Sequence, residues 1–231
     1  RIFSLFAFGD NALVARMINT MSALSSSFAV LFLFWSITML AKKIIVKSGE
    51  MTNSKMYAVF GSGIVGALAF TFTDSFWFSA TEGEVYAMSS FFIALIFWAI
   101  LKWEKVADQK HSYRWLIFIA YMIGLSIGVH LLSLLAIPAI TFVYYFRKYK
   151  NPKTKHIILV ALISILILGI VQNGIIPWIV NLSGMFELFF VNIIGLPFSS
   201  GTITYFILLI AIIIWGLRYT RRKQKVVINT L

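Results

Sequence analysis

Lysine and arginine occur in four short clusters, and the spacing of these clusters constrains the chain more than any other feature. All of them except Arg1 and Arg16 belong to a cluster: Lys42, Lys43, Lys47 and Lys55; Lys102, Lys105, Lys110 and Arg114; Arg147, Lys148, Lys150, Lys153 and Lys155; Arg218, Arg221, Arg222, Lys223 and Lys225. Long apolar runs separate the clusters. Because membrane proteins concentrate Lys and Arg in cytoplasmic loops, we place all four clusters in the cytoplasm. The formal net charge of +12 therefore indicates orientation in a membrane, and we expect no nucleic-acid partner.

The composition supports a membrane protein. Apolar residue types make up 60% of the chain and charged types 12%, and the mean hydropathy is +0.90. A soluble domain carries roughly 25% charged residues, because its surface must face water. This balance excludes an ordinary cytoplasmic enzyme and a disordered tail, and it makes the lipid bilayer the expected surrounding.

The apolar runs predict an all-α, polytopic integral membrane protein with about seven membrane helices. Simple spans are expected at residues 12–40, 57–72, 85–101, 157–176 and 203–217, with an outside loop at 73–84. The apolar residues 177–202, interrupted by Pro177, Gly184, Gly195 and Pro197, are typical of a segment lying on the outer surface, with Trp178 as an interfacial anchor.

Residues 115–146 present a topological problem, because both flanks are basic and should be cytoplasmic. A single helix of this length would measure about 48 Å, well beyond the roughly 30 Å hydrocarbon core. We predict a hairpin of two short helices that turns near Gly128 and His130, with Pro138 weakening the returning helix. The competing interpretation is one tilted span, which would invert the topology of everything after it.

Arg16 is the one basic residue predicted inside a membrane helix. A charge in that position is costly, so it is expected to face the bundle or a wet cavity and to bind an anionic group such as a lipid phosphate. The alternative is an arginine that extends to the outer interface and has no further role.

The stretch 73–84 contains Trp77, Glu82 and Glu84 and no basic residue. If it were helical, Glu82 and Glu84 would diverge by about 200° and could not share a site. Either one carboxylate faces a cavity, or the stretch is a solvated acidic loop. His130, at the expected hairpin tip, either donates a hydrogen bond to a phosphate or sugar hydroxyl or caps broken helix ends.

Neither the glycine motif nor the spacing of the histidines predicts a cofactor or metal site. Gly61, Gly63 and Gly66 form a literal G-x-G-x-x-G, but the motif lies inside an expected span, where small residues serve close helix packing. The three scattered histidines and the absence of cysteine predict no metal site and no cofactor.

Four stretches, in this order, resemble the bacterial membrane proteins of glycosyltransferase family 117. They are ARMINTMSALSSSFAVLFLF (15–34), SFWFSATEGEVYAMSSFF (75–92), GLSIGVHLLSLLAIP (124–138) and MFELFFVNIIGLPFSSG (185–201). That family is related to the animal transmembrane protein O-mannosyltransferase and belongs to the GT-C superfamily.

The resemblance implies a GT-C-type helical bundle that takes a mannose-like sugar from a polyprenyl- or dolichyl-phosphate carrier. The acceptor would be a protein Ser or Thr or a glycan. The enzyme would lie in the bacterial inner membrane with its active site facing the periplasm. Residues 1–231 would form a single GT-C-like domain, as a fragment inactive alone because it lacks the first helix and the first outside loop with the principal catalytic acid.

The resemblance also assigns roles to residues. Glu84 matches the acid of the family's second outside loop and is the expected catalytic residue, and His130 matches the histidine of the hairpin tip. Arg16 and His130 would hold the lipid phosphate; weaker substrate contacts would come from Glu82, Tyr86, Trp77, Glu187 and Asn192. A transporter or flippase, and a non-catalytic membrane scaffold, are the alternative functions.

Overall fold

The computed structural model describes residues 3–47, 49–149 and 151–222, and this part of the chain is built from helices joined by short turns. They form two compact units, residues 1–148 and 149–231. The helices of the first unit are η1 (Phe3–Ala7), α1 (Asn11–Ile45), α2 (Asn53–Thr71), α3 (Asp74–Thr81), α4 (Val85–Val106), α5 (Tyr113–Ile127), η2 (Leu131–Leu135) and α6 (Ala136–Lys148).

Five helical segments of the described chain are long and apolar enough to cross a membrane. A sixth results if α2 and α3, which meet at a bend of 68°, are counted as one broken span. The seventh expected stretch is α5, which is apolar but only 15 residues long. The polytopic, all-helical fold predicted from the sequence is confirmed.

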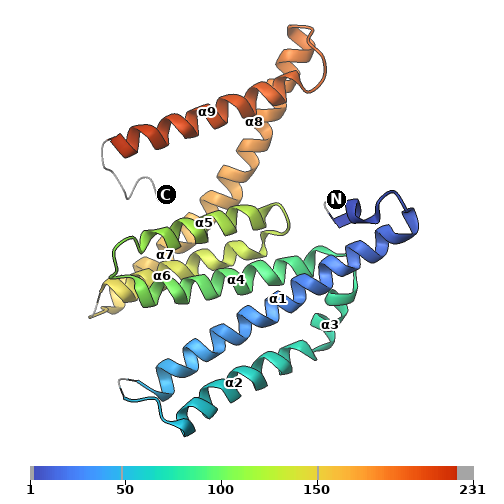
Figure 1. The fold of residues 1–231 in the computed structure, drawn as a ribbon. Helices are drawn as coiled ribbons and strands as arrows, with labels where there is room; N and C mark the ends of the chain where they lie inside the picture. The colour runs from blue at the N-terminus through green and yellow to red at the C-terminus, as the bar shows by residue number, and fades with distance from the viewer. Residues whose placement is uncertain (1–2, 48, 150, 223–231) are drawn as a thin grey trace. The chain divides into compact units, whose positions relative to one another are not determined.

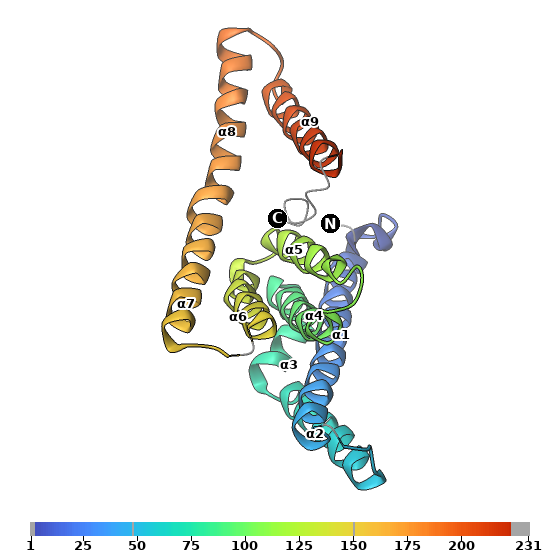
Figure 2. The ribbon, with the colours of Figure 1, turned by 90° about the vertical axis from the view of Figure 1, so that its left-hand side faces the viewer.

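Helix α4 lies at the centre of the first unit. It contacts α1 on one side and the α5 and α6 pair on the other, and α2 packs on the far side of α1 (Figures 1 and 2). Its buried residues Ile96, Ile100 and Trp103 form the core together with Ile119 of α5. The fold therefore depends on the middle of α4, and the ends of the helices remain available for other roles.

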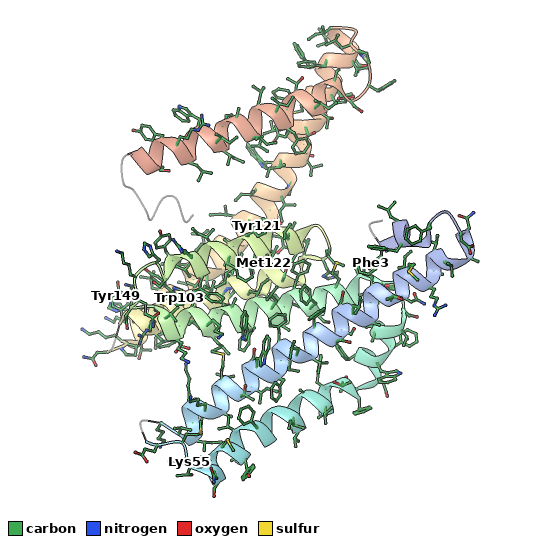
Figure 3. The ribbon with its side chains drawn as sticks, viewed as in Figure 1. Phe3, Lys55, Trp103, Tyr121, Met122 and Tyr149 are labelled. Carbon is green, nitrogen blue, oxygen red and sulfur yellow. The ribbon has the colours of Figure 1, made fainter. Side chains whose placement is uncertain are left out.

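The two ends of the first unit differ in charge. Lys55 and Trp103 lie at one end and Phe3 at the other (Figure 3). At the first of these, which we call the basic end, Lys43 pairs with Glu104 and Arg147 with Asp108. The opposite end, which we call the site end, carries the start of α1, residues 71–86 and the turn between α5 and η2. This division follows the alternation of basic clusters and acidic stretches in the sequence.

The α5–α6 hairpin predicted at 115–146 is confirmed, and the single tilted span is wrong. Helix α5 ends at Ile127, the chain turns through residues 128–130, and the return begins as the 3-10 helix η2. Both arms contact α4. Pro138 falls in the first turn of α6, where an amide N–H has no partner within the helix, so it does not break the helix.

The acidic stretch 73–84 is not the loop that we expected. Residues Asp74–Thr81 form helix α3, and only residues 82–84 are non-helical before α4 begins. Asp74 stands in the first turn of α3, where a carboxylate interacts favourably with the helix dipole. The prediction missed this helix because its eight residues are too few to show a periodic pattern.

The glycines of the G-x-G-x-x-G motif serve packing, as predicted. A Cβ atom on Gly63 would lie 2.5 Å from Thr38 Cγ2 and 2.9 Å from a ring carbon of Phe34, and one on Gly66 would lie 2.7 Å from Ile37 Cδ1. Gly61 has open space. Helix α2 therefore approaches α1 through two of the three glycines.

The second unit is a long helical rod followed by one returning helix. The rod comprises α7 (Thr154–Gly169), the π-helix η3 (Ile170–Ile175), α8 (Ile176–Leu188) and the π-helix η4 (Phe189–Ile193), and α9 (Ser200–Arg222) follows. The expected division at residue 176 into a span and a separate surface segment (177–202) is absent, because the helix continues to Ile193; the π-turn of η3 precedes Pro177, which lies in the first turn of α8. The chain is therefore helical without interruption from Thr154 to Ile193.

Candidate functional site

Three elements meet at the site end of the first unit: the beginning of α1, residues 82–84, and the turn of the α5–α6 hairpin. Gly83 ties the first two together, because a Cβ atom there would lie 2.7 Å from Ile18 Cγ2 and 3.3 Å from Asn19 Oδ1. Only glycine allows so close an approach. The short segment that carries Glu82 and Glu84 is thus fixed against α1.

Glu84 stands at the N-cap position of α4 with extended backbone angles (φ −106°, ψ 169°), and its side chain does not cap the helix. The side chain is exposed, whereas Glu82 is half-buried. Neither residue is helical, so the divergence of about 200° expected for a helix does not apply. The two carboxylates instead flank Gly83 and differ in burial.

His130 and Tyr86 are brought together by the packing of the hairpin on α4. Their ring centroids lie 5.8 Å apart with an interplanar angle of 47°. The ring of His130 also caps η2, because its Nδ1 accepts a hydrogen bond of 3.1 Å from the N–H of Leu132. Of the two roles left open by the sequence, the capping role is therefore real, and the other ring nitrogen remains for a ligand.

The hairpin turn is held by buried hydroxyl groups. Ser126 of α5 and Ser133 of η2, both fully buried, share a short hydrogen bond between their Oγ atoms. The backbone N–H of His130 donates to the carbonyl of Ser126 at 2.8 Å. These contacts fix the position of His130 relative to α5.

Arg16 lines a hollow between α1 and α3. The hollow measures about 540 Å³ and is lined by Arg16, Asn19, Thr20, Ala23, Ala80 and Thr81. Arg16 is exposed, and it belongs to neither of the two ion pairs that the described residues form. Its guanidinium group is therefore available to an anion from outside the chain.

Two further hollows continue this one along α3. The first, of about 290 Å³, shares Ala23, Ala80 and Thr81 with it and adds Phe76 and Trp77. The second, of about 400 Å³, is lined by Asp74 and Trp77 among others. We call the three together the α1–α3 groove. Its walls change from basic at Arg16 to aromatic and acidic at Trp77 and Asp74.

One buried hydroxyl on this groove was not among the candidate site residues. Ser26 lines the middle hollow, is 4% exposed, and its Oγ has no hydrogen-bond partner among the described residues. The four-residue spacing of Ser22 and Ser26 on α1 is the sequence signal that points to it. Gly83 was also missed, and its position between two acids is the corresponding signal.

The remaining candidates lie elsewhere. Glu187 accepts hydrogen bonds from the backbone N–H groups of Ser199 and of Thr202, the latter at 2.9 Å, and so caps the start of α9. Asn192 is exposed in η4. Both belong to the second unit. Within the described residues, no group of three or more His, Asp or Glu is close enough to hold a metal ion.

The site end therefore combines an exposed carboxylate, an unpaired guanidinium group and a histidine fixed through one ring nitrogen. A carboxylate can act as a general base towards a hydroxyl group. A guanidinium group and an N–H donor can bind a phosphate and stabilise the negative charge on it as it leaves.

Comparison with known proteins gives one family match. The family described as "Protein O-mannosyl-transferase TMEM260 N-terminal domain" matches residues 1–153, which is the whole first unit and the five residues after it. Neither a curated protein nor a solved structure matches the chain.

Proposed function

Since this chain belongs to the family of the protein O-mannosyl-transferase TMEM260 N-terminal domain, we propose that it acts as a membrane glycosyltransferase of the GT-C type. The donor is a mannose-like sugar on a polyprenyl- or dolichyl-phosphate carrier. The acceptor is a hydroxyl group, such as that of a protein Ser or Thr, on the far side of the membrane from the basic clusters. A bacterial enzyme of glycosyltransferase family 117 would carry out this reaction at the periplasmic face of the inner membrane.

The observation that carries the proposal is the position of Glu84. Its carboxylate is exposed at the site end, and its segment is fixed between α1, through Gly83, and the hairpin, through Tyr86 and His130. A base held on packed helices can meet an acceptor hydroxyl at a reproducible distance. Glu82, half-buried beside it, would contact the sugar.

Arg16 and His130 supply the groups that a leaving lipid phosphate requires. The guanidinium group of Arg16 can form two parallel hydrogen bonds to phosphate oxygens, and the N–H of His130 adds a further donor. Trp77 is exposed on the α1–α3 groove and Tyr86 beside His130, and their rings offer apolar faces to the sugar or the lipid.

The test is a transfer assay with the full-length protein in membranes, using a labelled polyprenyl-phosphate mannose. We expect Glu84→Gln to lower the transfer rate by at least 100-fold, because general bases contribute about 10²–10⁴-fold. Glu50→Gln, at the basic end, is the matched control and should retain the wild-type rate.

Wild-type transfer by Glu84→Gln would overturn the assignment of the base. Absence of transfer with any lipid-linked sugar would count against the enzyme. If solute flux across the membrane then proved dependent on Arg16, the transporter hypothesis would replace it.

A further inference from the structure

His130 is fixed by three contacts from three directions. Its backbone N–H donates to Ser126, its Nδ1 accepts from the N–H of Leu132, and its ring lies against Tyr86 of α4. The first contact holds the backbone of the turn, and the other two hold the imidazole ring. The ring therefore has one orientation relative to α4 and the hairpin.

The contact with Leu132 decides where the ring carries its proton. A backbone N–H can only donate, so the Nδ1 that faces it must have a free lone pair and no hydrogen. A neutral imidazole with a bare Nδ1 carries its hydrogen on Nε2. Nε2 has no hydrogen-bond partner among the described residues. It is thus a single, oriented N–H donor with nothing in the described chain to receive it.

An apolar groove is lined by residues that follow His130 closely in the chain. It measures about 320 Å³ and is lined by Leu132, Ser133, Leu135, Ala136 and Ala139 of the returning arm and by Ile93 and Phe97 of α4. No charged residue is among these, and α4 is one of the apolar helices long enough to cross a membrane. An isoprenoid or acyl chain is the ligand that such walls accept.

We infer that this hairpin groove, together with the Nε2–H of His130, forms a lipid-phosphate site. The chain of the lipid lies along Ala136 and Ala139, and a phosphate oxygen at its head accepts the hydrogen bond from Nε2. The Nε2–H group contacts the phosphate and not the sugar, because the phosphate is the group attached directly to the lipid chain. Helix η2 then has two roles, since His130 caps it through Nδ1 and three of its residues line the groove.

This site deepens the proposed function and rests on it only for the identity of the lipid as the sugar carrier. The tautomer of His130 and the binding of a lipid phosphate are measurable without any transfer reaction. The two claims can therefore fail separately.

The first experiment measures the tautomer directly. Histidine side-chain nitrogens are labelled with ¹⁵N in the full chain reconstituted in lipid, and the signal of His130 is identified by its loss in His130→Asn. We expect a neutral ring with the proton on Nε2 and a bare Nδ1. A proton on Nδ1, alone or together with one on Nε2, would overturn the inference.

The second experiment measures binding of undecaprenyl phosphate to the full chain in lipid nanodiscs. In His130→Asn the amide oxygen replaces Nδ1 and keeps the cap, but nothing replaces Nε2. In His130→Gln the amide nitrogen reaches the position of Nε2. We expect about a 10-fold weaker affinity for His130→Asn, because a hydrogen bond to a charged group is lost, and a tighter affinity for His130→Gln than for His130→Asn.

The groove is tested with the same ligand. Ala139→Leu fills the groove and should weaken binding, whereas Ala211→Leu makes the same change on an exposed face of α9 and should leave it unaltered. Undecaprenol, which lacks the phosphate, should bind His130→Asn and the wild type equally. Equal affinity of the wild type, His130→Asn, His130→Gln and Ala139→Leu for undecaprenyl phosphate, or a preference of His130→Asn over His130→Gln, would contradict the site even if transfer activity were found.

Discussion

At the scale of single residues, the same residues of the site end both hold the fold together and offer groups to a ligand. His130 caps a helix with one nitrogen and leaves the other free, and Gly83 is a glycine because α1 leaves no room for a Cβ. The family resemblance and the expected topology indicated Glu84 and His130 as candidates. It could not indicate which nitrogen of His130 was engaged, because that depends on the backbone of Leu132.

The buried hydroxyl pair under His130 should behave as a unit. Ser126→Ala or Ser133→Ala alone leaves the partner hydroxyl buried with one hydrogen bond fewer and should cost about 1 kcal/mol each. The double variant should cost less than the sum, because no buried hydroxyl is then left without its side-chain partner. Thermal unfolding of the four proteins in detergent measures the coupling, and strictly additive losses would show that the two hydroxyls do not interact.

Arg16 should act through the shape of its guanidinium group as well as its charge. In the transfer assay, Arg16→Gln should raise the KM for the lipid donor by about 10-fold, and Arg16→Lys should recover only part of the loss, because lysine cannot form the bidentate contact. Arg147→Gln, at the basic end, is the control and should leave KM unchanged. If Arg16→Gln also left KM unchanged, Arg16 would serve only to extend to the membrane interface.

At the scale of elements, close packing of helices could be predicted from small residues. Where each helix begins and ends could not be predicted as well. The glycines of α2 correctly indicated close contact with a neighbouring helix. Pro177, in contrast, suggested a break that the chain avoids with a π-turn, and α3 was too short to be recognised. The two errors have different causes: a π-turn leaves no regular mark in the sequence, and eight residues are too few to show a helical period.

The glycines of α2 offer a matched pair of substitutions. Gly63→Ala places a methyl group against Thr38 and Phe34 and should destabilise the protein by about 1–3 kcal/mol, since α1 and α2 must move apart. Gly61→Ala meets open space and should be neutral or slightly stabilising, because alanine favours a helix. The midpoint of thermal unfolding compares the two. A similar loss for both would mean that α1 and α2 do not pack through Gly63.

At the scale of the whole molecule, the charge pattern gave the order of the helices and the two ends of the first unit. It did not reveal that the chain divides into two units near residue 148, because the basic cluster there resembles the other three. The rod from Thr154 to Ile193 also exceeds one membrane thickness: its 40 residues correspond to about 60 Å. In a bilayer it must therefore tilt or extend beyond the hydrocarbon core.

The proposed chemistry requires the site end to face away from the cytoplasm. The chain contains no cysteine, so single cysteines can be placed at Ala80, His130, Pro152 and Phe190 and exposed to a membrane-impermeant maleimide in intact cells. We expect labelling from outside at positions 80, 130 and 190, and labelling at 152 only after the membrane is opened. Labelling of position 152 from outside, or protection of positions 80 and 130, would contradict the orientation on which the glycosyltransferase site depends.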